Sequence, residues 1–375
     1  MPNDTTITPS DPDSLADAVA TTAFLAEHAV RENVKSPPED LFTGAHGDLI
    51  FVKICAALAD APTVVKIQAL QRVRDLTRKA ENIPIAIEKG VFQELNLNLG
   101  DWDPDVRRLS AESIVFVTDT QAGRMHTLEE DIMSTFAKLL NDADTGVKLS
   151  GYKIFSNLAL TASGLEAIID FNLIDKFILK ILQEKDDAVK VKCLEVLGQC
   201  IRFESGIGYQ KAMEANVVST LKVALGGSKN QPALEAAICK VFSYIAYNSD
   251  GKDKIVEVGT VPLILALLRS ENNTVRIAAT GCLTFITVSL AGKVAVVEED
   301  MGVESLIAGC AHKNDYIASN SMQALANVAE HPQCKAMECI QEEELVWRLT
   351  AQQKRQNPLV QRAAACCIEK IKWKP

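Results

Sequence analysis

The sequence predicts an all-α protein built from about eight copies of one helical unit stacked end to end. Three observations support this prediction. Small and apolar residues recur with a period of about 42 residues along most of the chain. Hydrophobic residues make up 47% of the 375 residues but aromatic residues only 5%, which is typical of helices packed through Leu, Ile, Val and Ala. Polar turns separate the apolar segments at matching places in each copy.

Residues 1–47 form an acidic extension that lacks the repeat. Two turn-rich segments, "TTITPSDPDS" and "KSPPED", flank one apolar stretch, "LADAVATTAFLAEHAV". We expect the apolar stretch to form a helix that either caps the first repeat or docks on a partner. The segment before it is expected to be disordered when the chain is alone.

Residues 48–375 carry the repeats, and the long third helix of each repeat has the clearest pattern. One residue near the start of that helix serves as its anchor. The anchors are Val65, Val106, Val147, Val189, Ala233, Val275, Ile317 and Val360. The approximate repeats that follow from this spacing are 48–89, 90–130, 131–171, 172–215, 216–258, 259–300, 301–340 and 341–375.

Small and apolar residues follow each anchor at fixed distances. The residue four positions later is small in every copy: Ala69, Ser110, Gly151, Cys193, Ala237, Ala279, Ser321 and Ala364. The residue eight positions later is apolar in every copy: Val73, Ile114, Phe155, Leu197, Val241, Leu283, Leu325 and Ile368. These positions share one helix face, so we expect that face to be buried. The small position is expected to face the same helix of the next repeat, at a close crossing.

Two further helices precede each long helix. An apolar helix comes directly before it, as in "NLIDKFILKIL" and "NVVSTLKVAL", and a shorter segment such as "AGKVAVVEE" comes before that. Polar turns such as "GDWDPD" and "NDADTG" join the second helix to the third. Asp, Asn and Ser in these turns can cap the long helix by accepting hydrogen bonds from its free backbone N–H groups.

The unit length and the three-helix order resemble the armadillo repeat, from residue 48 to the C-terminus. The resemblance implies a right-handed α-α superhelix, an armadillo-repeat solenoid, whose long helices line a concave groove. By analogy with the family, the sixth and tenth residues after each anchor would face that groove. The candidate partner-binding residues are Glu112, Phe116, Lys153, Asn157, Glu195, Gln199, Ser243, Phe285, Gln323 and Asn327.

The groove differs from that of nuclear-import adaptors, which resemble this chain in architecture. Those adaptors carry Trp at the sixth position and Asn at the tenth in several successive repeats, and the array grips an extended basic peptide. Here no Trp occupies the sixth position, and among the candidates only Asn157 and Asn327 supply Asn at the tenth. Binding of a nuclear import signal is therefore disfavoured. Phe116 and Phe285 could instead anchor apolar groups of a partner. Glu112 and Glu195 could bind its basic groups.

The sequence offers no pattern for catalysis or for a metal ion. His331 and Cys334 lie three residues apart, but Pro332 follows His331 and places it in a loop. The glycine-rich "GGSKN" follows a helix and lacks the spacing of a phosphate-binding loop, so we interpret it as a turn. No nucleophile elbow occurs in the chain. We therefore expect no enzyme activity, no cofactor and no metal.

Composition also limits the partners. The formal net charge of -10 argues against nucleic acid, because phosphate binding requires clustered Lys and Arg. No stretch reaches the roughly 18 apolar residues of a membrane span, and the first residues do not read as a secretory signal. Cysteines within helical patterns are expected to be reduced and to pack as small apolar groups; they include Cys193, Cys239, Cys282, Cys366 and Cys367.

Residues 122–169, "AGRMHTLEEDIMSTFAKLLNDADTGVKLSGYKIFSNLALTASGLEAII", resemble a narrower group within the armadillo repeats, the radial spoke head 14 family. The shared features are Gly-Arg leading to "LEEDI", a double Leu before an Asp-rich turn, and Val-Lys-Leu opening the long helix. The resemblance implies a scaffold subunit of a large complex, the radial spoke, in the cytoplasm and axoneme of a cilium or flagellum. Its partners would be other spoke or axonemal subunits. The alternative is a soluble armadillo adaptor that binds an extended peptide or cargo in transport or signalling.

Overall fold

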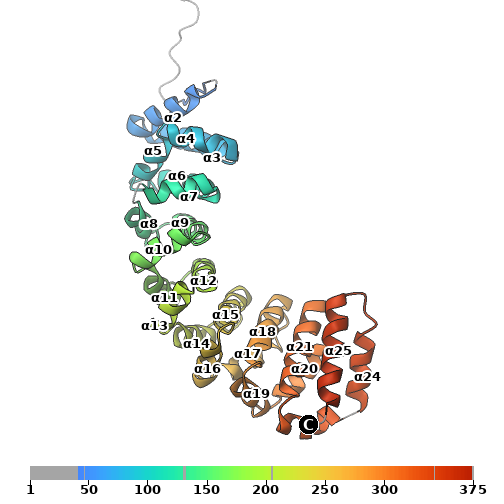
Figure 1. Ribbon diagram of the computed structural model, residues 1–375. Coiled ribbons are helices and arrows are strands. Elements are labelled where there is room, and N and C mark those ends of the chain that lie inside the picture. Colours follow the sequence, from blue (N-terminus) through green and yellow to red (C-terminus); the bar gives the residue numbers. More distant parts are fainter. Residues whose placement is uncertain (1–40, 46, 130–131, 204–205, 342, 374–375) are drawn as a thin grey trace, which may run out of the picture.

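The computed structural model describes residues 41–45, 47–129, 132–203, 206–341 and 343–373, and these residues form helices and turns without any strand. The helix expected within residues 15–30 lies outside this part of the chain. Figure 1 shows the helices stacked in layers from α2 to α25, with a pronounced bend near α12 and α15. The all-α solenoid predicted from the period is confirmed. The division into eight approximate repeats remains a prediction at the level of its exact boundaries.

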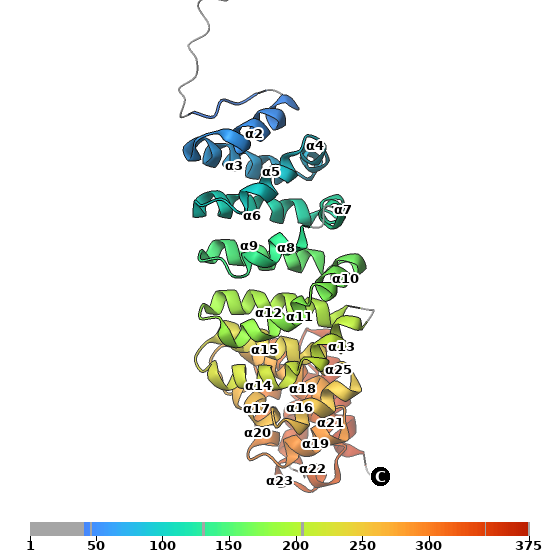
Figure 2. The same cartoon turned by 90° about the vertical axis from the view of Figure 1, so that its left-hand side faces the viewer.

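Within the described residues, eight long third helices follow one another along the stack. They are α3 (Thr63–Thr77), α6 (Pro104–Asp119), α9 (Thr145–Leu158), α12 (Asp187–Arg202), α15 (Pro232–Ile245), α18 (Asn273–Ile286), α21 (Asp315–Val328) and α25 (Pro358–Lys372). Each packs directly on the long helix of the next repeat. Figure 2 shows α6, α9 and α12 lying one below another.

Second and first helices complete the units. The second helices are α2 (Leu49–Asp60), α5 (Val91–Asn98), α8 (Met133–Leu139), α11 (Leu173–Gln183), α14 (Val217–Gly227), α17 (Val261–Leu267), α20 (Gly302–Cys310) and α24 (Glu343–Gln352). The first helices are α4 (Ile83–Glu88, after the short 3₁₀ helix η1, Ala80–Asn82), α7 (Gln121–Glu129), α10 (Ala162–Asp170), α13 (Ile207–Glu214), α16 (Ser249–Glu257), α19 (Leu290–Val297), and the pair α22 (Pro332–Ala336) and α23 (Glu338–Gln341). In Figure 2 the first helices α7 and α10 lie along one edge of the stack.

Polar side chains start most of the long helices, as the turn sequences predict. The Asp103 carboxylate accepts from the backbone N–H of Asp105 at 2.9 Å, and the Asp144 carboxylate accepts from that of Val147 at 2.9 Å. The same position is filled by Asp186, Asn272, Asn314 and Asn357 at the starts of α12, α18, α21 and α25. These caps fix where six of the eight long helices begin; α3 and α15 have no side-chain cap.

The core is continuous from the first described repeat to the last. One apolar cluster extends from Ile50 to Cys367, so each repeat shares its core with its neighbours. Aromatic rings join α8, α9 and α11 within this core. The Phe155 ring lies edge-on to Phe136 with centroids 6.5 Å apart, and edge-on to Phe177 with centroids 5.8 Å apart.

The predicted register is wrong in α15. The anchors of the other seven long helices are buried as expected, but in α15 Ala233 is exposed and Leu234 is buried in its place. The residue four positions after Leu234 is Ile238, so this repeat lacks the small residue found in the others. The turn before α15 includes Asn230 in the left-handed conformation, at φ 67°, and its last residue, Gln231, makes no side-chain cap.

The small residues also have a different neighbour from the one predicted. A Cβ added at Gly151 would lie 2.9 Å from the Cβ of Leu139, which belongs to α8 of the same repeat. Likewise a Cβ added at Gly309 in α20 would lie 2.9 Å from the Cβ of Ser321 in α21. In these two repeats the small residue therefore lets the second helix approach its own third helix, rather than the next repeat.

Candidate functional site

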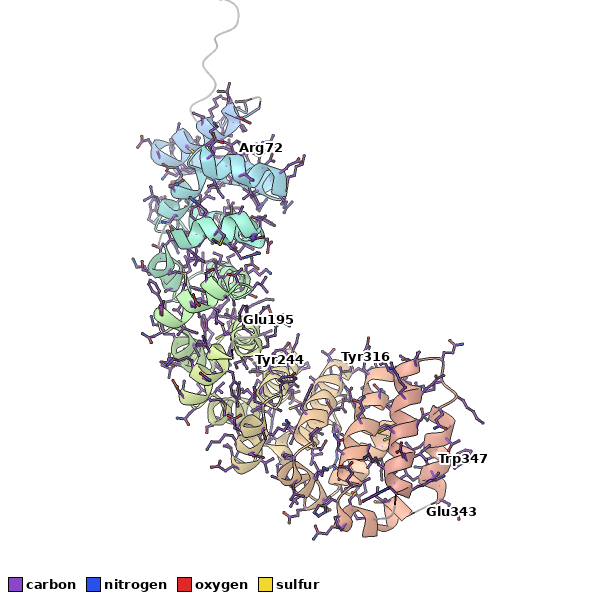
Figure 3. The ribbon with its side chains drawn as sticks, viewed as in Figure 1. Arg72, Glu195, Tyr244, Tyr316, Glu343 and Trp347 are labelled. Atoms are coloured by element: carbon purple, nitrogen blue, oxygen red, sulfur yellow. The ribbon has the colours of Figure 1, made fainter. Side chains whose placement is uncertain are left out.

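The bend gives the stack an inner surface formed by its long helices. Figure 3 shows Arg72 of α3, Glu195 of α12, Tyr244 of α15 and Tyr316 of α21 along the inner side of this bend. Tyr244 takes the tenth position after Leu234, the place that the predicted register assigns to Ser243. The inner surface is therefore lined by the helices that the sequence selects, with one residue replaced in α15.

Three candidate residues of the first arm lie together but already have internal partners. Glu112, Phe116 and Lys153 line a shallow cleft of about 220 Å³. Arg74 Nη1 donates to Glu112 Oε2 at 3.3 Å, and the Arg78 guanidinium carbon lies 5.7 Å from the centroid of the Phe116 ring. Phe116 is half-buried, so it presents less free apolar surface than the sequence predicts.

The two asparagines at the tenth position join neighbouring repeats. Asn157 Nδ2 donates to Asp119 Oδ1 at 2.8 Å and to Thr118 Oγ1 at 3.1 Å, both at the end of α6. Asn327 Nδ2 donates to Thr287 Oγ1 at 3.1 Å, directly after α18. Because these amide N–H groups bond to the preceding repeat, both residues hold the stack together.

Other predicted residues are more accessible. Glu195 is exposed and pairs with Lys192 on its own helix, at 2.7 Å, and Gln323 is exposed on α21. Gln199 Nε2 donates to Ser156 Oγ of the preceding repeat at 3.3 Å and is half-buried. Glu195 and Gln323 therefore leave polar groups free to meet a partner.

A larger cavity opens near the bend, and we call it the corner pocket. Its volume is about 950 Å³, and its walls include Leu160, Gln199, Ser243, Tyr244, Tyr247 and Phe285. The structure thus brings together three predicted residues, Gln199, Ser243 and Phe285, from three successive long helices. The Ser243 hydroxyl donates to the backbone oxygen of Cys239 at 3.0 Å, so Ser243 takes part mainly through its place in the wall.

Aromatic rings dominate the corner pocket. Tyr247 is 75% exposed and Phe285 is 38% exposed, and their ring centroids lie 6.5 Å apart. Tyr244 packs against α12 at Gly198, where a Cβ would lie 3.0 Å from its ring. Exposed rings held against a concave wall lose much water contact when a partner binds, which makes them strong anchors.

The sequence prediction missed Tyr244 and Tyr247. Tyr244 is missed because the anchor of α15 is placed one residue early. A recurring glycine could have corrected the register. A Cβ added to this glycine would clash with the backbone oxygen of the residue six positions earlier, and this holds for Gly123, Gly164, Gly251 and Gly292. Gly123, Gly164 and Gly292 lie seventeen residues after their anchors. Gly251 does so only if Leu234, rather than Ala233, is the anchor of α15. Tyr247 lies just after the helix and outside the predicted positions.

Most cysteines are buried, as their helical pattern predicts. Burial raises the pKa of Cys193, Cys200 and Cys282 to about 12, so these thiols stay protonated at neutral pH. Cys55 and Cys339 are half-buried, and Cys366 is exposed on α25. All ten cysteines lie in the described residues, and no disulfide joins any two of them.

Two further searches covered only the described residues. Among them no three His, Cys, Asp or Glu side chains lie close enough to hold a metal ion. No helix in the same part of the chain has both the length and the apolar character needed to cross a membrane.

Comparisons with known proteins agree with this architecture. Residues 248–287 match the family model described as Armadillo/beta-catenin-like repeat. Radial spoke protein 14 of Chlamydomonas reinhardtii is 25% identical over 335 residues, which cover 87% of this chain and 86% of that protein.

Solved structures show the same fold. The crystal structure of an engineered protein superposes with a TM-score of 0.73 at 19% identity, covering 87% of this chain and 79% of that one. A designed armadillo repeat protein in complex with the peptide (KR)4 superposes with a TM-score of 0.56 at 17% identity, covering 63% of this chain and 98% of that one. Together with the three-helix unit, these matches show an armadillo-repeat solenoid.

Proposed function

We propose that this armadillo-repeat protein is a non-catalytic scaffold of the radial spoke in the ciliary or flagellar axoneme, where it holds other spoke subunits. The observation that carries the proposal is the extent of the similarity to radial spoke protein 14. It covers 87% of this chain and 86% of the relative, so it includes almost the whole stack and not a single repeat. A shared length of this kind favours a shared role in an assembly over a shared repeat alone.

The structure supplies surfaces that suit such a role. The corner pocket offers Tyr247 and Phe285 as apolar anchors, and Glu195 and Gln323 offer polar groups along the same inner side. Binding energy at protein interfaces concentrates on a few such buried aromatic side chains. A partner subunit would therefore bind mainly at the bend and make weaker polar contacts along the arms.

A scaffold also has to keep its shape under load. Successive repeats share one core, and side-chain bonds between layers add to it, as at Arg107 and Asp142, whose Nε and Oδ2 atoms are 2.8 Å apart. Slippage of one repeat past the next would break both kinds of contact. The function then requires adhesive surface and stiffness, and it uses no reacting group.

Localisation and capture test the proposal directly. A tagged copy expressed in ciliated or flagellated cells is expected to label the axoneme along its length and to co-purify with spoke proteins from isolated axonemes. Labelling confined to the cell body and nucleus would contradict the axonemal role. It would favour an adaptor that binds a peptide or cargo in the cytoplasm.

The binding surface has its own test. The double variant Tyr247→Ala with Phe285→Ala is expected to weaken capture of axonemal partners by about thirtyfold or more, because truncation of an interface anchor typically removes about 2 kcal/mol or more. Helicity should be unchanged, since Tyr247 is exposed just after α15 and Phe285 is partly exposed. Trp102→Ala is the matched control, because Trp102 is 78% exposed in the turn before α6. If Trp102→Ala lost capture and the double variant did not, the binding surface would lie at the turn before α6 instead.

A further inference from the structure

Ion pairs join the first repeats of the stack in a regular series. In each pair, the cation directly after one anchor binds an acid five residues before the next anchor. The pairs are Lys66 with Asp101 at 3.2 Å, Arg107 with Asp142 at 2.8 Å, and Lys148 with Glu184 at 3.0 Å. All six side chains are largely buried, so each pair neutralises two charges that water reaches poorly.

The turn acid in these pairs has a second bond. Asp142 Oδ1 accepts from the backbone N–H of Asp144 at 2.8 Å, and Asp101 Oδ1 accepts from that of Asp103 at 2.9 Å. The side chain five residues before the anchor therefore accepts one bond from its own turn. It also accepts one from the cation of the preceding repeat.

Arg276 and His312 occupy these two positions at the junction of α18 and α21. His312 Nδ1 accepts from the backbone N–H of Asn314 at 3.0 Å, so the turn bond is retained. The proton of the neutral ring then lies on Nε2, which can only donate. Asp142 therefore accepts a hydrogen bond from Arg107, whereas His312 has only a donor left and cannot accept one from Arg276.

Among the described residues, Arg276 lacks the acidic partner that Lys66, Arg107 and Lys148 have. Its Nε is buried without an acceptor, and within the described part of the chain its guanidinium makes no ion pair. Burial lowers the pKa of His312, and the nearby charges of Arg276, Lys313 and Arg355 lower it further, which favours the neutral form of the ring.

A cavity of about 420 Å³ lies between these side chains. Arg276, His312 and Ser321 line it, and Ser321 is wholly buried with a hydroxyl that has no hydrogen-bond partner. Leu268 and Met301 add apolar wall. Arg269 and Glu304 also reach it, but Arg269 is exposed and Glu304 also borders a separate cleft beside Arg348.

We propose that this cavity binds a phosphate group, which replaces the missing acid of the ion-pair series. The phosphate oxygens accept from the Arg276 guanidinium, from His312 Nε2–H and from the Ser321 hydroxyl. A guanidinium with two further donors suits a phosphate better than a lone carboxylate, because phosphate offers more acceptor oxygens. The ligand is either free inorganic phosphate or a small phosphate monoester whose organic part lies against Leu268 and Met301.

Thermal unfolding and titration calorimetry of the full chain test the site. Inorganic phosphate is expected to raise the unfolding midpoint above that in chloride at equal ionic strength, because a ligand of the folded state stabilises it. Phenyl phosphate is the monoester probe. Tighter binding of phenyl phosphate identifies a ligand with an organic part, and equal or weaker binding identifies the free ion. Equal midpoints in phosphate, phenyl phosphate and chloride would refute the site.

Three variants separate the site from general charge effects. Arg276→Gln is expected to weaken phosphate binding by about tenfold or more, since it removes a charge-assisted bidentate contact. His312→Asp rebuilds the acid found at this position in the three ion pairs of the first repeats, so it should abolish the phosphate response and raise the midpoint without phosphate. Lys229→Gln removes an exposed cation at the matching turn position of another repeat and should leave the response unchanged.

Two results would overturn the proposal. Equal loss of the response in Arg276→Gln and Lys229→Gln would show that phosphate acts through general charge. A lower midpoint of His312→Asp without phosphate, in a chain that keeps its helical signal, would show that Glu304 already balances Arg276.

Discussion

A glycine near the start of four first helices lets each of them rest on the preceding long helix, and its replacement gives the sharpest stability test. A Cβ at Gly292 in α19 would lie 2.0 Å from the backbone oxygen of Ile286 and 2.7 Å from its carbonyl carbon. Carbon and oxygen normally approach to roughly 3.3 Å, so Gly292→Ala must displace α19 by about 1 Å. The obstacle is backbone, which cannot rotate away as a side chain could.

The magnitude follows from two opposing effects. Overpacking of this kind usually destabilises by about 1–3 kcal/mol, and the obstruction here is close enough for the upper part of that range. Alanine favours helix over glycine by about 1 kcal/mol, which offsets part of the loss. We therefore expect Gly292→Ala to lower the free energy of unfolding by about 2 kcal/mol.

Gly226→Ala is the matched control. Gly226 lies inside α14, and a Cβ there would meet nothing within 4 Å. Only the helix preference then operates, so this variant should gain about 0.5–1 kcal/mol. Urea unfolding followed by the helical circular dichroism signal compares the two variants with the parent chain. If Gly292→Ala unfolds at the same urea concentration as Gly226→Ala, the close approach of α19 to Ile286 is wrong.

Two further predictions concern charge and thiols. Asp142→Asn should destabilise the chain by about 2–3 kcal/mol, because it leaves the largely buried Arg107 without its anion. Burial of Asp142 disfavours its charged form, but hydrogen bonds from Arg107 and Asp144 outweigh this and lower its pKa, so the contribution is complete above its unfolded pKa and is lost as pH falls through the lower folded value. Urea unfolding should therefore show the parent and variant converging only below about pH 4, and a constant difference into stronger acid would contradict this. Iodoacetamide at pH 8 should modify exposed Cys366 before buried Cys193, as read by peptide mass, and equal rates would contradict the burial.

The sequence predicts the repeating face well because a local signal controls it. Capping side chains such as Asp103 and Asp144 lie a fixed three residues before the buried anchor, so the turn sequence sets the register of the helix. Before α15 that signal is absent, because the N-cap residue is Gln231 and its side chain makes no cap. Alanine at 233 then satisfies the apolar pattern although the helix buries Leu234.

The candidate groove is harder to predict, because side chains of adjacent repeats use it. The spacing places Asn157 at the tenth position correctly, but the acceptor of its amide, Asp119, lies in another repeat at a distance no period reveals. Phe116 is likewise covered by Arg78 of the repeat before it. Phe285 remains 38% exposed, and the ring it contacts, Tyr247, lies outside the positions that the period selects.

The end of the ion-pair series offers a physical reason for the bend. The last regular pair joins Lys148 to Glu184, and at the next junction the two matching positions carry Lys190 and Lys229. These like charges cannot pair, and Lys190 instead binds Asp187 on its own helix at 3.0 Å. The stack changes direction around this junction, between α12 and α15 (Figure 1). The ion pairs that join the repeats before α12 are therefore missing at the junction where the corner pocket opens.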